Sequence, residues 1–597
     1  MMEKNTILAI VLSVLVLVGF TVLQNFLYPP QAEQAVLEQP VENTVPEPAV
    51  IDASPVRLEA PAAAPLEEAG SAEDIPEETF SIKTNHAEVT FTNRGGDLIS
   101  YKLLDHTDKG QPVEMADSIT AKNRAYSLSL GKESARADII DAIFKTEKIG
   151  NESITFSKTF ADFSLIKKYT FSPDEYMFKL DIEVRPAGGK EIAYTLRSQP
   201  QIGPYFNAKV DRYEMRKFMT FTGQKRKEKR LNPGDVTPYD NRGWFARMTN
   251  QKQDKTFTWT GVGGKYFAVL LLPQNPESIE TITYSSMTEV ENYANAQLFL
   301  ARSPVTASVA DTFYIYVGPL TEKNLKIYNT GDENAWNLSG TQLNESLPSM
   351  GVLSWLEVIL KAGMEIVYKV IPNWGVAIII MTFFIKLLMF PLTRKSSVST
   401  LKMQEIQPQL QALQAKYKDN PQKLNEEMAK FYKETGYNPM SGCFPLLIQF
   451  PIIIAMYNLF NNYFEFRGAP FIEGWIPDLS LGDSIYEFNF MIPFLNTSFL
   501  RLLPIIYVAS QLLSGKITQT ANTTTGAAAT QMKIMMYGMP FIFFFIFYSA
   551  PSGLLIYWTV SNILQLFQQL LINRIMAKKR AEMAVAPKQT FVPRKKK

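Results

Sequence analysis

The chain has 597 residues, of which 60 are Lys or Arg and 58 are Asp or Glu, so its net charge is only +2. It contains one cysteine, Cys443, which excludes an intramolecular disulfide and a cysteine-based zinc site. The only histidines, His86 and His106, argue against a His-rich metal site. We therefore expect several domains held together by their own cores, with no metal or cofactor.

The N-terminal residues 1–28 contain an apolar run, 7–26, that is long enough to cross a hydrocarbon core of about 30 Å. Lys4 precedes the run and no small-x-small cleavage site follows it, which favours an uncleaved signal anchor. A cleaved signal peptide is the alternative. Residues 29–79 are rich in Pro, Ala and Glu and are strongly acidic, so we expect a disordered tether.

Residues 80–335 alternate between apolar and polar side chains with a period of two, which is typical of half-buried strands. Tyr176, Phe178 and Leu180 alternate with Met177 and Lys179, for example. Gly-containing turns separate the strands. This pattern predicts a large β-sandwich domain.

A helical period replaces this pattern over residues 352–371. Glu357, Lys361, Glu365 and Lys369 fall on one face, and apolar residues fall on the other. The segment is expected to be an amphipathic helix in the membrane interface. A soluble helix packed on the β domain is the alternative.

Five further apolar segments lie within residues 373–572, so that the chain is predicted to be a polytopic α-helical membrane protein with six spans. They cover residues 373–392, 443–464, 499–513, 534–549 and 554–572. The loop 394–440 carries eight Lys or Arg residues and the tail 573–597 carries nine, whereas the loop 465–497 carries one. The positive-inside rule places the basic segments and both termini in the cytoplasm, and residues 29–350 in the periplasm.

Lys386 lies inside the span 373–392, where a charged side chain costs roughly 2.5–3.5 kcal/mol unless it faces protein or water. It either snorkels to the cytoplasmic surface or faces a water-filled cavity. Polar residues on single helical faces of several spans favour the cavity, and interhelical hydrogen bonding is the alternative. These residues are Thr382, Gln449, Tyr507, Gln511, Tyr557, Ser561 and Gln565. No carboxylate lies within the core of any span, which argues against an ion-coupled transporter.

The loop 394–440 has apolar residues at 3-4 spacing on both sides of a turn at residues 419–421. They are Met403, Ile406, Leu410, Leu413 and Tyr417 before the turn, and Leu424, Met428 and Phe431 after it. The spacing predicts an antiparallel helical hairpin in the cytoplasm. Because a connector needs far fewer residues, we expect the hairpin to be a docking element.

Several short motifs in the last 220 residues resemble those of the YidC/Oxa/Alb family of membrane protein insertases. They include the sequence from Gly442 to Gln449, the turn at 551–554, the Tyr557-Trp558 pair and the Gln568-Gln569 pair. The anchor and the domain 80–335, with its motif Asn93-Arg94-Gly95-Gly96-Asp97, resemble the long Gram-negative form. The resemblance implies a five-helix core, a periplasmic β-supersandwich and a hydrophilic groove open to cytoplasm and lipid.

In the family, a cation lies in the groove at the position of Lys386, where many relatives carry arginine. The resemblance also implies that Thr382, Gln449, Tyr557 and Trp558 line the groove. Lysine keeps the charge but lacks the planar fork of a guanidinium, so we expect an electrostatic role only.

We therefore expect a membrane protein insertase and chaperone of the bacterial inner membrane, and not an enzyme. Expected partners are nascent or released membrane proteins, membrane lipids and the Sec translocon, and also the ribosome through the hairpin and basic tail, but not DNA. A small-solute channel and a membrane-anchored periplasmic glycan-binding protein are the alternatives.

Overall fold

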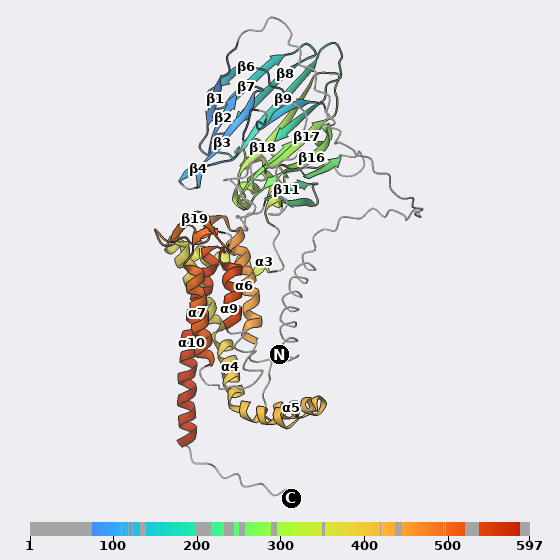
Figure 1. Cartoon of the computed structure of the whole chain (residues 1–597). Coiled ribbons are helices and arrows are strands. Elements are labelled where there is room, and N and C mark those ends of the chain that lie inside the picture. The colour runs from blue at the N-terminus through green and yellow to red at the C-terminus, as the bar shows by residue number, and fades with distance from the viewer. Residues whose placement is uncertain are drawn as a thin grey trace, which may run out of the picture. The chain divides into compact units, whose positions relative to one another are not determined.

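The computed structural model of the chain (Figure 1) contains a β-rich part followed by a helical part. It describes residues 75–585 except 109, 117–118, 122, 132–138, 199–215, 232–243, 250–256, 288–294, 349–352, 418–419, 436–443, 494, 496 and 520–536. The predicted signal anchor, most of the predicted tether and the end of the tail lie outside these residues.

The β domain consists of three antiparallel sheets. The four-stranded sheet has the order β1-β2-β3-β4, with β1 Thr79–Lys83, β2 Ala87–Thr92, β3 Asp97–Asp108 and β4 Gln111–Glu114. The five-stranded sheet has the order β13-β16-β17-β10-β5, with β13 Trp244–Thr249, β16 Ile279–Met287, β17 Asn295–Arg302, β10 Tyr194–Ser198 and β5 Ser127–Leu130.

The nine-stranded sheet has the order β12-β11-β14-β15-β18-β9-β8-β7-β6. Its strands are β12 Arg226–Leu231, β11 Arg216–Phe221, β14 Trp259–Gly263, β15 Phe267–Pro273, β18 Val309–Pro319, β9 Met177–Pro186, β8 Phe163–Phe171, β7 Ser153–Thr159 and β6 Lys145–Ile149. Alternation along β9 buries Phe178, Leu180 and Ile182, as the period of two predicts. All three sheets contribute to one apolar core.

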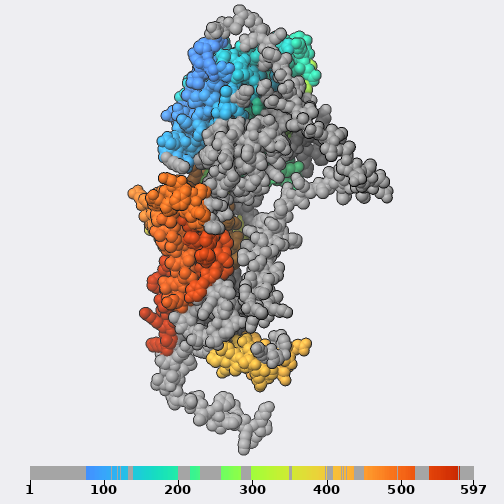
Figure 2. Space-filling view, viewed as in Figure 1, coloured from blue at the N-terminus to red at the C-terminus, as the bar shows by residue number. Residues whose placement is uncertain are grey.

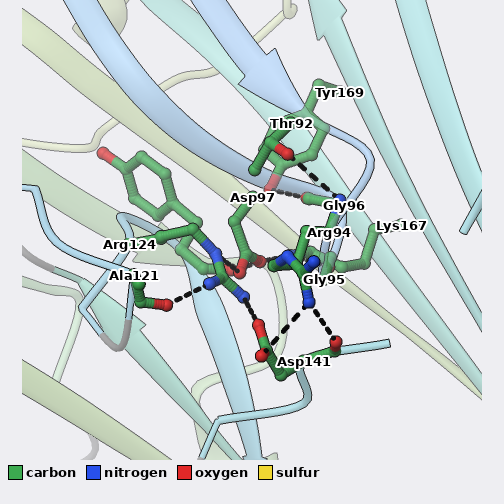
Figure 3. A network of polar contacts seen from close by, with 11 residues as sticks. Thr92, Arg94, Gly95, Gly96, Asp97, Ala121, Arg124, Asp141, Lys167 and Tyr169 are labelled. Carbon is green, nitrogen blue, oxygen red and sulfur yellow. Dashed lines mark hydrogen bonds and ion pairs between the residues drawn. The ribbon is translucent and has the colours of Figure 1, made fainter. Parts of the chain in front are cut away.

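A cluster of charged side chains lies buried within the β domain, around the turn that leads into β3 (Figure 3). Asp97 Oδ1 accepts a hydrogen bond from Lys167 Nζ at 2.5 Å, and Asp97 Oδ2 accepts one from Arg124 Nε at 2.9 Å. Burial lowers the pKa of Lys167, and the charge of Asp97 opposes that shift. Because Asp97 is on β3 and Lys167 is on β8, the pair joins the four-stranded sheet to the nine-stranded sheet.

Close to this cluster, Asn93 and Arg94 bind the chain that enters β1. Asn93 Nδ2 donates to Pro76 O at 2.8 Å, and Arg94 Nη2 donates to Glu77 Oε2 at 2.8 Å. The Arg94 hydrogen bond lowers the pKa of Glu77. The tether predicted over 29–79 therefore ends at a defined attachment on the β domain.

Short helices follow the last strand of the β domain, and α2 Glu322–Lys326 is the first of them. The helical part then contains α3 Ser354–Val370, α4 Trp374–Lys416, α5 Pro421–Thr435, α6 Phe444–Asn462, α7 Leu503–Gln519, α9 Met539–Phe547 and α10 Ser552–Val585. A two-stranded ribbon, β19 Tyr486–Ile492 and β20 Thr497–Leu500, lies between α6 and α7.

Two long helices run beyond the expected spans. Helix α4 continues from the span 373–392 through the first arm of the predicted hairpin to Lys416. Helix α10 continues past residue 572 into the basic tail and ends at Val585. The residues beyond each span are mostly Lys, Arg, Gln, Glu, Met, Leu and Ala, which are strong helix formers. Helix α4 therefore continues past the predicted boundary, although Pro391 and Pro408 lie inside it.

Among the described residues, two helices are long and apolar enough to cross a membrane. They are Trp374–Ser396, with 23 residues, and Ser552–Ile575, with 24 residues; Leu503–Ile517 is a shorter apolar helix. Helices α3, α4, α6, α7 and α10 share one apolar core. At Gly553 the backbone of α10 comes so close to α6 that an added Cβ would lie 2.8 Å from the Phe460 ring.

Candidate functional site: a lysine among neutral side chains

Lys386 lies in the middle of the apolar part of α4, and its side chain points into the helical bundle. Only 7% of its surface is exposed. Its Nζ donates to Gln449 Oε1 on α6 at 3.5 Å and to Gln565 Oε1 on α10 at 3.4 Å. Among the residues that the structure describes, no carboxylate forms an ion pair with Lys386. Its two hydrogen-bond partners are neutral amide oxygens, so no carboxylate of the described residues occupies the position next to Nζ.

One of the two amides around Lys386 is itself oriented by a further hydrogen bond, and a third glutamine contacts the lysine backbone. Gln449 Nε2 donates to the Tyr557 hydroxyl at 2.7 Å, so that Gln449 turns its oxygen toward the lysine. Gln568 Nε2 donates to the backbone carbonyl of Lys386 at 3.1 Å. Three helices, α4, α6 and α10, therefore supply one connected polar cluster made of Lys386, Gln449, Tyr557, Gln565 and Gln568.

The remaining residues predicted for the groove lie at different distances from this cluster. Thr382 is buried one turn before Lys386, and its hydroxyl donates to Ile378 O of its own helix at 2.6 Å. Trp558 stacks on Tyr507 of α7 with 5.5 Å between ring centroids. Ser561 is buried on α10, whereas Gln511 is half-buried on α7. The hydrogen bonds of Lys386 found in the described part of the chain do not include these five residues.

A second polar contact joins α7 to α10. Asn562 Nδ2 donates to Ser510 Oγ at 3.2 Å. Asn562 lies three positions before Gln565, hence on a neighbouring face of the same helix. The spacing of polar residues along α10 could have indicated Asn562. Ser510, in contrast, lies in an apolar stretch of the sequence that does not indicate a partner.

The predicted docking hairpin corresponds to the end of α4 together with α5. Leu410 is buried, and most of the other predicted docking residues are half-buried: Ile406, Leu413, Tyr417, Leu424, Met428 and Phe431. The side chain of Met403 lies outside the described residues. Asn420 Oδ1 accepts from Lys423 N at 3.1 Å and caps the start of α5.

Helix α3 packs on α4 and α6 through Leu360 and Met364, which are buried. Its acidic residues contact the end of α6: Asn458 Nδ2 donates to Glu357 Oε1 at 2.9 Å, and the Tyr463 hydroxyl donates to Glu365 Oε1 at 2.7 Å. The apolar residues on its outer face are exposed, and they are Trp355, Val358, Ile359, Ile366 and Val370. The side of α3 that faces the bundle thus combines apolar packing with polar contacts, and its outer face is apolar.

Comparison with known proteins identifies the family. Residues 79–358 match the profile of the YidC periplasmic domain, and residues 366–580 match that of the 60Kd inner membrane protein. The membrane protein insertase YidC of Treponema denticola is 45% identical over 97% of this chain and 100% of its own length. The chain belongs to the YidC family of membrane protein insertases. The YidC of Treponema pallidum is 39% identical over 96% of this chain and 99% of its own length.

Solved structures with a similar fold were also found. A crystal structure titled as an active YidC insertase with its first transmembrane domain resolved has a TM-score of 0.33 and 18% identity, and covers 84% of this chain and 94% of its own. A galactose mutarotase-like protein from Lactobacillus casei has a TM-score of 0.29 and 11% identity, and covers 40% of this chain and all of its own. Likenesses at these scores do not bear on the function.

Family membership confirms the resemblance that the motifs indicated, and with it a periplasmic β domain, a helical core and an inner-membrane location. It also confirms that the chain is an insertase and not an enzyme.

Proposed function

We propose that this chain inserts membrane proteins into the inner membrane and helps them to fold and assemble, and that the cluster around Lys386 holds the polar flank of the substrate. The observation that carries this proposal is a lysine that is 7% exposed and is bound by neutral amides. Such a charge attracts an acidic or polar segment that is leaving water. Thr382, Tyr507, Gln511, Trp558, Ser561 and Gln565 would form the walls of this groove.

The energy for insertion would come from two sources. Burial of the apolar substrate span in lipid is favourable by roughly 25 cal/mol per Å². The membrane potential adds about 2.3 kcal/mol per elementary charge for each 100 mV. The polar flank is the unfavourable part of the transfer, and Lys386 lowers its cost by providing a charge in a region of low dielectric.

The topology that we propose has six spans with both termini in the cytoplasm, and residues 29–350 in the periplasm. It rests on the basic loop and tail and on the scarcity of basic residues over 465–497. The hairpin formed by the end of α4 and α5 would then project into the cytoplasm and receive nascent or released substrates. Ribosomes would dock on this hairpin and on the basic tail, and the Sec translocon would act as a partner in the membrane.

The test replaces Lys386 by Met, Arg or Glu and measures insertion of a single-span substrate into proteoliposomes. With an acidic translocated flank, we expect K386R to retain insertion, and K386M and K386E to lose most of it. A substrate with a neutral flank should be much less affected. Lys369, which is exposed on α3, supplies the matched control K369M, which should behave like the wild type.

Three outcomes would contradict the proposal. Normal insertion of the acidic-flank substrate by K386E would remove the electrostatic role of Lys386. Solute flux through the proteoliposomes without insertion of any substrate would favour a channel. Loss of all insertion on deletion of residues 80–335 would favour a primary role of the periplasmic domain, such as glycan binding.

A further inference from the structure

The ribbon formed by β19 and β20 carries a row of aromatic side chains that the cluster around Lys386 does not use. Tyr486, Phe488 and Phe490 alternate along β19 and therefore lie on one face. Their rings contact one another, with centroids 4.9 Å apart for the first pair and 5.2 Å for the second. Glu487 and Asn489 occupy the alternate positions, so that the ribbon has an aromatic face and a polar face.

The aromatic face is exposed. Tyr486 is 59% exposed and Phe490 is 61% exposed. Residues of this segment form part of the orange surface in Figure 2. A two-stranded ribbon is marginally stable in water, and exposed aromatic rings add a further unfavourable term. The face therefore fits an apolar or interfacial environment better than bulk water.

The base of the ribbon is fixed to the ends of the helices. Ile485 N donates to Leu500 O at 3.0 Å. The Tyr548 hydroxyl, beyond the end of α9, donates to Phe499 O at 3.2 Å and accepts from Arg501 N at 3.1 Å. Asp483 Oδ2 accepts from the backbone N–H of Leu503, the first residue of α7, at 3.0 Å. The ribbon thus extends from a rigid platform.

This platform lies at the end of the bundle where α4 begins. Asn373, the N-cap of α4, donates from Nδ2 to Phe471 O at 3.4 Å, and Phe471 belongs to the segment that leads to the ribbon. Trp374 stacks on Tyr368 of α3 with 4.2 Å between ring centroids. The exposed apolar face of α3 and the aromatic face of the ribbon therefore lie at the same end of the helices.

We propose that the aromatic face of β19 rests in the headgroup region of the lipid bilayer and fixes the depth of the helical core. Tyr and Trp side chains are enriched at membrane–water interfaces, where an apolar ring body and a polar edge are both satisfied, and the Phe rings beside Tyr486 gain free energy by leaving water. The face carries no charged side chain. This inference rests on the proposed function only in so far as the helices span the bilayer.

The test measures the depth of single side chains in the full chain reconstituted in vesicles of phosphatidylethanolamine and phosphatidylglycerol. Cys443 is the only cysteine, so C443S provides a background for spin labels. The variant F490C places the label on the aromatic face, and N489C places it on the polar face one residue away. Spin relaxation by oxygen, which concentrates in lipid, is compared with relaxation by a water-soluble nickel chelate.

We expect the ratio of oxygen to nickel accessibility to be several-fold higher at position 490 than at position 489. Equal, high nickel accessibility at both positions would show a ribbon in water and would overturn the inference. Low accessibility of position 490 to both reagents would show a protein partner instead of lipid and would also overturn it. Insertion activity measured on the same vesicles separates this failure from a failure of the proposed function.

Discussion

Replacement of Asp97 by Asn should destabilise the β domain strongly, because it leaves a buried cation without its counter-charge. Asp97 and Lys167 are fully buried, and Arg124 is almost so, with contacts of 2.5 and 2.9 Å to the two carboxylate oxygens. Removal of one partner from a buried ion pair costs about 3–5 kcal/mol. At about 1.4 kcal/mol per power of ten, the unfolded fraction should rise by between about two and four powers of ten.

Urea-dependent proteolysis of the full chain in detergent, with detection of the β domain, measures this change. Asp141 offers the matched control, since it contacts Arg124 in the same cluster but is 54% exposed. The D141N variant should lose less than about 1 kcal/mol. The double variant D97N/K167M should be more stable than D97N alone, because it removes the orphaned charge. A D97N variant no less stable than D141N would refute the role assigned to the buried cluster.

Three further predictions concern single contacts. The variant Y557F removes the hydroxyl that accepts from Gln449, and this lost hydrogen bond is worth about 1 kcal/mol. Insertion of acidic-flank substrates should become several-fold slower at normal protein level. An unchanged rate would show that Gln449 needs no orientation. The variant D483A removes the carboxylate that accepts from the backbone N–H groups at the start of α7, and it should lower the thermal stability of the purified protein by about 1 kcal/mol. The control D478A leaves these hydrogen bonds in place and should not lower it if this capping is the cause. Because Arg94 lowers the pKa of Glu77, the pair stabilises the β domain at pH values above 4.5, the pKa of Glu77 in the unfolded chain. This stabilisation disappears as the pH falls through the lowered pKa of the folded state. The urea midpoint of R94A should therefore fall less between pH 6 and pH 3 than that of the wild type, and parallel curves would argue against the pair.

Much of the helical site could be predicted because it depends on local periodicity. Gln449, Tyr557 and Gln565 were each predicted from a polar position in an apolar helix, and the structure places them with Lys386. The helix ends were less predictable, since α4 and α10 continue through residues that favour helix on both sides of the membrane boundary. The thickness of the bilayer sets where a span ends, and helix propensity gives no information about that thickness.

The buried cluster of the β domain could not be predicted in the same way. The residues from Arg94 to Asp97 read as a polar turn, and turns are normally solvated. Lys167 lies 70 positions further along the chain, on a strand whose alternation puts it on the apolar face with Leu165 and Tyr169 but does not indicate its partner. Only the pairing of the sheets brings these charges together, and a pattern within one strand carries no information about the strands that pack on it.

The central claim, that the polar cluster around Lys386 contacts the substrate, is tested most directly by photocrosslinking to a stalled membrane-protein nascent chain. A photoreactive residue at position 565 keeps Lys386 intact and lies beside it, since Gln565 Oε1 is 3.4 Å from Lys386 Nζ. Phe567 on the same helix is 62% exposed and serves as the control position. We predict strong crosslinks from position 565 at short nascent-chain lengths and weaker ones from position 567. Equal or stronger crosslinking from position 567 would contradict the account, because the substrate would then pass along the lipid-facing surface and not through the cluster.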